Sequence, residues 1–136
     1  IGQANILVAP EKPLVAIIAC GPLVHQALVA ARLLTREKVE VTVINCHTVK
    51  PLDGKTILAE AKRAGVVVTV EEHQQAGGLG SAIAELLATN YPVPIEFVGV
   101  RDQFGQSGTP AELVEHYGLG VEGIITAVKG VIERRG

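Results

Sequence analysis

The stretch LVAIIACGPLVHQALVAARLLTREKVEVTVINC, residues 14–46, decides the fold. It opens with an unbroken apolar run that Gly21 and Pro22 interrupt, which is typical of a strand buried on both faces that ends in a turn. Apolar residues then recur at helical spacing over residues 24–34, and a second β-branched run covers residues 39–46. The stretch therefore predicts a strand, a helix packed on the sheet and a second strand.

The same alternation continues along the chain. Apolar residues share one helix face over residues 57–64, and a β-branched run follows at residues 66–70. A glycine-rich loop then leads to a helix around residues 83–87 and a strand at residues 95–100. Strands separated by helices must return to the same edge of a sheet, so the sheet is expected to be mainly parallel.

The expected fold class is therefore α/β: a three-layer, mainly parallel open sheet of about five strands flanked by helices. Residues 1–13 are expected to form a separate N-terminal segment, with an edge strand at residues 6–8 and then a turn bounded by Pro10 and Pro13. Residues 14–136 are expected to form a single domain.

Two helices are predicted after the last strand. Thr109, Pro110 and Glu112 form a capping box with proline at the first helical position, which predicts a helix over residues 111–117 that stops at Gly118. Residues 121–135 then carry an apolar stripe at helical spacing, which predicts a last helix that closes the core.

The composition excludes several kinds of partner. The net charge is −2 with both signs interspersed, so neither a nucleic acid nor an anionic membrane is expected to bind. The apolar runs are far shorter than a membrane span. Two cysteines in a chain rich in aliphatic residues indicate a reducing cytoplasm, and the absence of methionine suggests an excised domain or a processed fragment.

Polar residues follow each predicted core strand. In open parallel sheets, ligands bind outside the carboxyl ends of the strands, so these residues are the first candidates for a site. The residues at the ends of the four strands, in chain order, are Cys20; Cys46 and His47; Glu71, Glu72 and His73; and Arg101 and Asp102.

The polar residues at the carboxyl ends of the predicted strands match no known pattern of a metal site or a catalytic site. A zinc site of Cys20, Cys46, His47 and His73 would lack any short paired spacing, so buried thiols and surface histidines are the preferred interpretation. Cys46 and His47 are neighbours in a strand and should point to opposite faces, which disfavours a nucleophilic pair.

Two loops keep alternative interpretations. The glycines of residues 77–81 could hold a phosphate at the start of a helix, but they match neither a P-loop nor a dinucleotide motif, so close packing of helix on sheet is preferred. In the loop of residues 101–109, Phe104 could anchor the loop or meet a partner subunit, and both interpretations stay open.

Three segments also carry a family resemblance: HTVKPLD at 47–53, VEEHQQAGGLGSAIAE at 70–85 and VRDQFGQSGTPAELVEHYGL at 100–119. In order and spacing they resemble the C-terminal domain of transketolases. The beta subunits of 2-oxo-acid dehydrogenases and the deoxyxylulose-phosphate synthases end in a similar domain. The Glu72-His73 pair and the form FGQSG after residue 103 favour the transketolases.

The resemblance implies a role for the parent enzyme. Transketolases move a two-carbon ketol unit between sugar phosphates in the pentose phosphate pathway, using thiamine diphosphate and a divalent metal, Mg²⁺ or Ca²⁺. In that family the cofactor lies between two other domains, and this domain supports a cytoplasmic homodimer. No catalytic, cofactor-binding or metal-binding residue is therefore expected here, and the isolated domain is expected to be inactive.

The expected partners are the other domains or the second subunit of the parent enzyme. The candidate residues for these contacts, or for a ligand, are His47, Glu72, His73, Gly77, Gly78, Gly80, Ser81, Arg101, Phe104 and Ser107. Two alternatives stay open: a regulatory module that binds a phosphorylated metabolite in the crevice at the strand ends, and a different parent, either a dehydrogenase beta subunit or a deoxyxylulose-phosphate synthase.

Overall fold

The computed structural model describes residues 3–47, 52–72, 78–100 and 110–135, with side chains described outside residues 110–119. Its centre is a five-stranded sheet in the order β1-β3-β2-β4-β5. The strands are β1 (Ala4–Val8), β2 (Val15–Ala19), β3 (Val41–Cys46), β4 (Val67–Glu72) and β5 (Ile95–Val100). Strands β2 to β5 run parallel, which confirms the predicted mainly parallel sheet.

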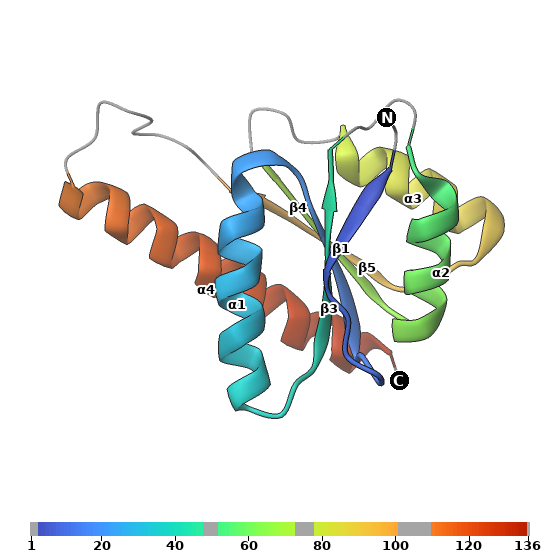
Figure 1. Ribbon diagram of the computed structural model, residues 1–136, viewed down its shortest axis with the longest axis horizontal. Coiled ribbons are helices and arrows are strands. Elements are labelled where there is room, and N and C mark those ends of the chain that lie inside the picture. The colour runs from blue at the N-terminus through green and yellow to red at the C-terminus, as the bar shows by residue number, and fades with distance from the viewer. Residues whose placement is uncertain (1–2, 48–51, 73–77, 101–109, 136) are drawn as a thin grey trace.

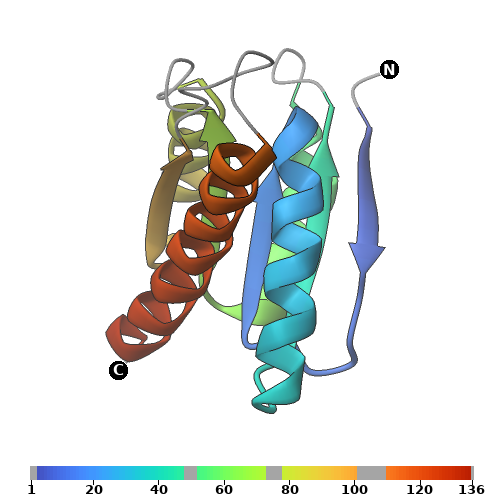
Figure 2. The same ribbon diagram turned by 90° about the vertical axis from the view of Figure 1, so that its left-hand side faces the viewer.

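Helices cover both faces of the sheet and give the three layers that were predicted. A 3₁₀ turn, η1 (Gly21–Leu23), leads into α1 (Val24–Arg36), which shares one face with α4 (Pro110–Arg134), as Figure 1 and Figure 2 show. The opposite face carries α2 (Gly54–Ala64) and α3 (Leu79–Asn90).

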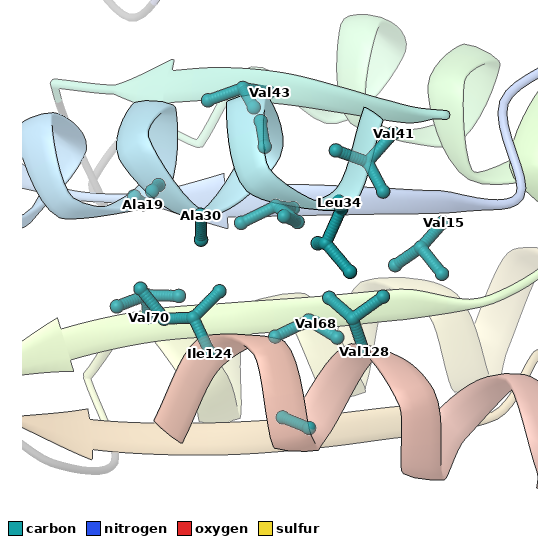
Figure 3. Close-up of a cluster of buried hydrophobic side chains, with 14 of the residues drawn as sticks. Val15, Ala19, Ala30, Leu34, Val41, Val43, Val68, Val70, Ile124 and Val128 are labelled. Carbon is teal, nitrogen blue, oxygen red and sulfur yellow. The ribbon is translucent and has the colours of Figure 1, made fainter. Parts of the chain in front are cut away.

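The core consists of two aliphatic clusters, one on each side of the central strand β2. Because side chains alternate along a strand, Val15 and Ile17 face α1 and α4, whereas Ala16 and Ile18 face α2 and α3. Figure 3 shows the first cluster, in which Leu34 of α1 and Val128 of α4 lie over the sheet. Residues Val15 to Ala19 are fully buried, as their unbroken apolar run predicted.

The predicted edge strand at residues 6–8 is confirmed and begins two residues earlier. Strand β1 pairs antiparallel with β3, and the register shifts between Ile6 and Val8. Ile6 and Leu7 are 42% and 43% exposed, so apolar side chains lie on this edge of the sheet.

The predicted helix stop at Gly118 is wrong. A single helix, α4, runs from Pro110 to Arg134 without a break. Glycine costs only about 1 kcal/mol relative to alanine inside a helix, and packing can outweigh that cost. At Gly120 the packing is visible, because an added Cβ would lie 3.3 Å from the Gln26 Cδ of α1. Close approach of α4 to α1 therefore favours glycine within a continuous helix. Thr109 of the predicted capping box lies outside the described residues.

Within the described ranges, no helix combines the length and apolar character needed to cross a membrane.

Candidate functional site

The carboxyl ends of the parallel strands meet at one edge of the sheet, as predicted. In sheet order, His47 follows β3, Cys20 follows β2, and Glu72 ends β4. His47 and Glu72 are separated by β2, a distance of about 10 Å between strand axes, so they do not form one cluster. The edge divides into a part around β4 and α3 and a part around β1, β3 and α2.

The first part centres on Glu71, which lies inside β4 and is 7% exposed. Strand β4 was predicted to end at Val70, but it continues because Glu71 and Glu72 pair with Gly99 and Val100 of β5. This pairing fixes the Glu71 side chain on the face covered by α3. There, Glu71 Oε2 accepts a hydrogen bond of 2.7 Å from the Gly80 N–H.

This hydrogen bond occupies the N-terminus of α3. The first N–H groups of a helix lack partners within the helix, and the helix dipole favours a negative charge near them. Gly80 is the second residue of α3, so Glu71 supplies an acceptor for one of these N–H groups. The glycine loop therefore presents its helix N-terminus to a side chain of the protein itself.

A cavity of about 280 Å³ lies beside this hydrogen bond, between α3 and β5. Gly80 is confined there, because an added Cβ would lie 2.8 Å from Phe97 Cδ1. This distance confirms the preferred interpretation of that glycine as a close-packing residue. The cavity is lined by Thr69, Glu71, Gly80, Ser81, Ala84, Phe97 and Val98.

Cys20 lies on the same face of the sheet as Glu71 and is half-buried. Burial raises the pKa of its thiol above the ordinary value, and the nearby charges of Glu71 and then Glu72 raise it further. A thiol held in its neutral form is a poor nucleophile, so the environment disfavours a catalytic role for Cys20.

The second part of the edge joins β1 to β3 and α2. His47 is exposed, and its Nε2 lies 2.9 Å from Asn5 Nδ2. Asp53 caps α2 by accepting from Thr56 N at 3.2 Å and Thr56 Oγ1 at 2.8 Å, and it also accepts from Ala4 N at 2.9 Å. The hydrogen bond from Ala4, then those from Thr56, lower the pKa of the Asp53 carboxyl. These contacts hold the edge strand in place.

The remaining candidates fall into two groups. Gly78 is exposed at the N-cap of α3, Ser81 lies in the first turn of that helix, and Glu72 is half-buried. The others lie outside the described residues: His73, Gly77, Arg101, Phe104 and Ser107. No group of three or more His, Cys, Asp and Glu side chains that could hold a metal ion occurs among the residues that the structure describes.

Sequence reasoning placed Glu71 at the end of a strand but left it out of the final list of contact residues, and it did not single out Phe97 at all. The run VVVTVEE contains the signal for Glu71, because alternation places it on the same face as Thr69 and Val67. Phe97 belongs to β5, which is an edge strand of the sheet, and its side chain is 56% exposed.

The fold and the site together define the class of protein. It is a doubly wound α/β module in which side chains of the protein itself, such as Glu71 and Asp53, make hydrogen bonds at the carboxyl ends of the parallel strands. The sequence model of the family "Transketolase, C-terminal domain" matches residues 2–124 of this chain. The chain therefore belongs to the transketolase C-terminal domain family.

Individual relatives agree with this family. The chain is 44% identical over 135 residues to the 6-deoxy-6-sulfo-D-fructose transketolase subunit SqwH of Clostridium sp. strain MSTE9, covering 99% of the chain and 41% of the relative. It is 43% identical over 114 residues to a 1-deoxy-D-xylulose-5-phosphate synthase of Syntrophotalea carbinolica, covering 83% of the chain and 18% of the relative.

A solved structure shows the same fold. It is a split gene transketolase, described as an inactive beta4 tetramer, which is 40% identical with a TM-score of 0.81. The match covers 97% of this chain and 43% of that one. The chain thus spans less than half the length of the relatives described here.

Proposed function

We propose that this domain supports the assembly of a transketolase-type enzyme and does not itself hold the cofactor. In this proposal the parent enzyme transfers two-carbon ketol units between sugar phosphates with thiamine diphosphate and a divalent metal, Mg²⁺ or Ca²⁺. The domain contacts the other domains or the second subunit of a cytoplasmic homodimer. Its match to the family over residues 2–124 supports the parent class.

One observation carries the proposal: the Glu71 carboxylate occupies the N-terminus of α3. A diphosphate bound there would need the free N–H groups and the positive end of the helix dipole. Glu71 already accepts from the Gly80 N–H at 2.7 Å, and its negative charge would repel the diphosphate. This end of α3 therefore does not fit the diphosphate group of thiamine diphosphate.

The same contact weighs against the regulatory alternative. A sugar phosphate in the strand-end crevice would meet Glu71 and the half-buried Glu72. Both carboxylates disfavour an anionic ligand at this part of the edge. A thermal-shift screen with sugar phosphates tests this directly, because binding to the folded chain would raise its melting temperature.

Both edges of the sheet offer apolar surface that supports a role in assembly. Ile6 and Leu7 are exposed on β1, and Phe97 is 56% exposed on β5. Exposed apolar edge strands favour unwanted pairing unless another chain or domain covers them. Coverage by the rest of the enzyme would remove this hazard.

Titration calorimetry tests the absence of a cofactor site. The chain is titrated with thiamine diphosphate in the presence of Mg²⁺, and a saturable heat would contradict the proposal. The matched control is the whole enzyme, which is expected to bind under the same conditions. Ketol transfer by the isolated chain would contradict the proposal equally.

A further inference from the structure

The two cysteines of the chain occupy equivalent positions on adjacent strands at the carboxyl edge of the sheet. Strands β2 and β3 are parallel neighbours, and their register pairs Ala19 with Asn45. Cys20 and Cys46 are the next residues along the two strands, and both are present as thiols. The register therefore places the two cysteines side by side.

The two cysteine side chains also lie on the same face of the sheet. Side chains alternate along a strand, so residues two positions apart point to one side. Ile18 and Ile44 form a register pair, and both belong to the aliphatic cluster under α2 and α3. Two residues further on, Cys46 belongs to that cluster and Cys20 packs against it. Both thiols therefore point into the same layer.

The spacing of the strands suits a bond between the two sulfurs. Neighbouring strands lie about 4.8 Å apart, and the Cα atoms of a disulfide are usually about 4.4–6.8 Å apart. The Cβ atoms of a disulfide lie closer, at about 3.5–4.5 Å, so one residue must shift slightly. The pairing of β2 with β3 stops at Ala19, and Gly21 begins the turn η1. Cys20 is therefore the residue that can adjust.

An oxidant in solution meets Cys20 first. Cys20 is half-buried, whereas Cys46 is 1% exposed. Burial, and then the charges of Glu71 and Glu72, raise the pKa of the Cys20 thiol, so its thiolate is scarce and the first step is slow. Disulfides are easily reduced where the protein stabilises the thiolate, and this environment does not stabilise it. The surroundings of Cys20 therefore favour the bond once it has formed.

We propose that Cys20 and Cys46 form a reversible disulfide, which makes this edge of the sheet a redox-sensitive site. The oxidant is a small-molecule disulfide such as glutathione disulfide. The Cys20 thiolate attacks it, forms a mixed disulfide and releases one glutathione thiolate. The Cys46 thiolate then displaces the second glutathione. The two thiols lose two protons and two electrons in all, and glutathione disulfide becomes two glutathione molecules.

The disulfide would tie the end of β2 to the end of β3 and close a loop that contains α1. Such a cross-link stabilises the folded chain because it constrains the unfolded chain. In a reducing compartment a bond of this kind is transient and reports on oxidation. The inference goes beyond the proposed function and does not rest on it, because it needs only the geometry of the two thiols.

Equilibration of the chain with glutathione redox buffers at about pH 8 tests the bond. Remaining thiols are alkylated after an acid quench, and mass spectrometry of the digested chain identifies the linked peptides. We expect one peptide pair joined through Cys20 and Cys46, which disappears when reduced glutathione is in excess. The midpoint gives the effective concentration of one thiol at the other, which should be at least about tenfold higher in the folded chain than in urea.

The melting temperature provides a second measurement. A bond that forms more readily in the folded chain must stabilise the fold by the same factor. The oxidised chain should therefore melt about 5 °C or more above the reduced chain. Cys46→Ala is the matched control: its Cys20 should stop at the mixed disulfide with glutathione, and its melting temperature should not rise on oxidation.

Three results on the wild-type chain would overturn the inference. They are a mixed disulfide at Cys20 that persists while Cys46 stays a thiol, a disulfide that joins two chains, and an effective concentration no higher in the folded chain than in urea. None of these depends on the folding of a variant. Binding of thiamine diphosphate in the calorimetry would contradict the proposed function and leave this test unaffected, so the two failures are distinguishable.

Discussion

The Gly80 N–H donates to Glu71 Oε2 over 2.7 Å, which ties the start of α3 to the carboxyl end of β4. Gly80 is also buried against Phe97 of β5, so two neighbouring strands and one helix meet at this glycine. The contact gives one N–H group at the start of α3 an acceptor within the protein, and it makes the stability of this edge depend on Glu71.

Replacement of Glu71 by alanine should lower the free energy of unfolding by about 2 kcal/mol, because the buried Gly80 N–H loses a charged acceptor. Glu71→Gln keeps an acceptor and should cost less than about 1 kcal/mol. Urea unfolding measures both, with Glu72→Gln as the control. Equal losses for the alanine and glutamine variants would show that the hydrogen bond does not matter.

Gly80→Ala should destabilise the domain by about 1 kcal/mol, because the added methyl would lie 2.8 Å from Phe97 Cδ1. The ring is exposed and can move, which keeps the cost at the low end. Gly130→Ala is the matched control: nothing lies within 4 Å of its Cβ, and it should stabilise α4 by about 0.5–1 kcal/mol. Thermal or urea unfolding compares the two.

A double variant isolates the contact with Phe97. In the Phe97→Ala background, Gly80→Ala should cost clearly less than in wild type, since the clashing ring is gone. An unchanged cost would place the strain elsewhere around α3.

Asp53→Ala should cost about 1 kcal/mol near neutral pH, because α2 loses its N-cap. The folded pKa of Asp53 is lowered, so its contribution is present above the unfolded value of about 4 and is lost as pH falls through the folded pKa. The stability difference between wild type and the variant should therefore shrink below about pH 4. A difference that is constant with pH would contradict the role assigned to the carboxylate.

Cys20 should react with iodoacetamide more slowly in the folded chain than in the unfolded chain at about pH 8, because burial and the two carboxylates raise its pKa. A Cys46→Ala background makes Cys20 the only reporter. Glu71→Gln and Glu72→Gln should each accelerate the reaction in the folded state. Equal folded and unfolded rates would contradict the assigned environment.

The framework of the fold followed from sequence because local patterns and tertiary packing agree there. The strand predicted at residues 95–100 has those bounds, and the fully buried β2 follows from the apolar run at residues 14–20. The edge strand predicted at residues 6–8, before a turn bounded by Pro10 and Pro13, lies within β1.

The wrong predictions concern features of the structure that tertiary contacts determine. Propensity predicts that the helix stops at Gly118, but α4 continues through it, and Gly120 two residues later packs against Gln26 of α1. Glu71 reads as a residue after a strand, yet pairing with Gly99 keeps it inside β4 and directs it toward α3. Local sequence contains neither partner, so these features need the assembled sheet.

Sedimentation velocity on the whole enzyme tests the assembly role most directly. The full-length enzyme is compared with a version that lacks residues 1–136, and both are measured over the same range of protein concentrations with thiamine diphosphate and Mg²⁺ present. We expect the shortened enzyme to dissociate into monomers at concentrations where the full-length enzyme stays dimeric. A dimer of undiminished stability without these residues would contradict the account.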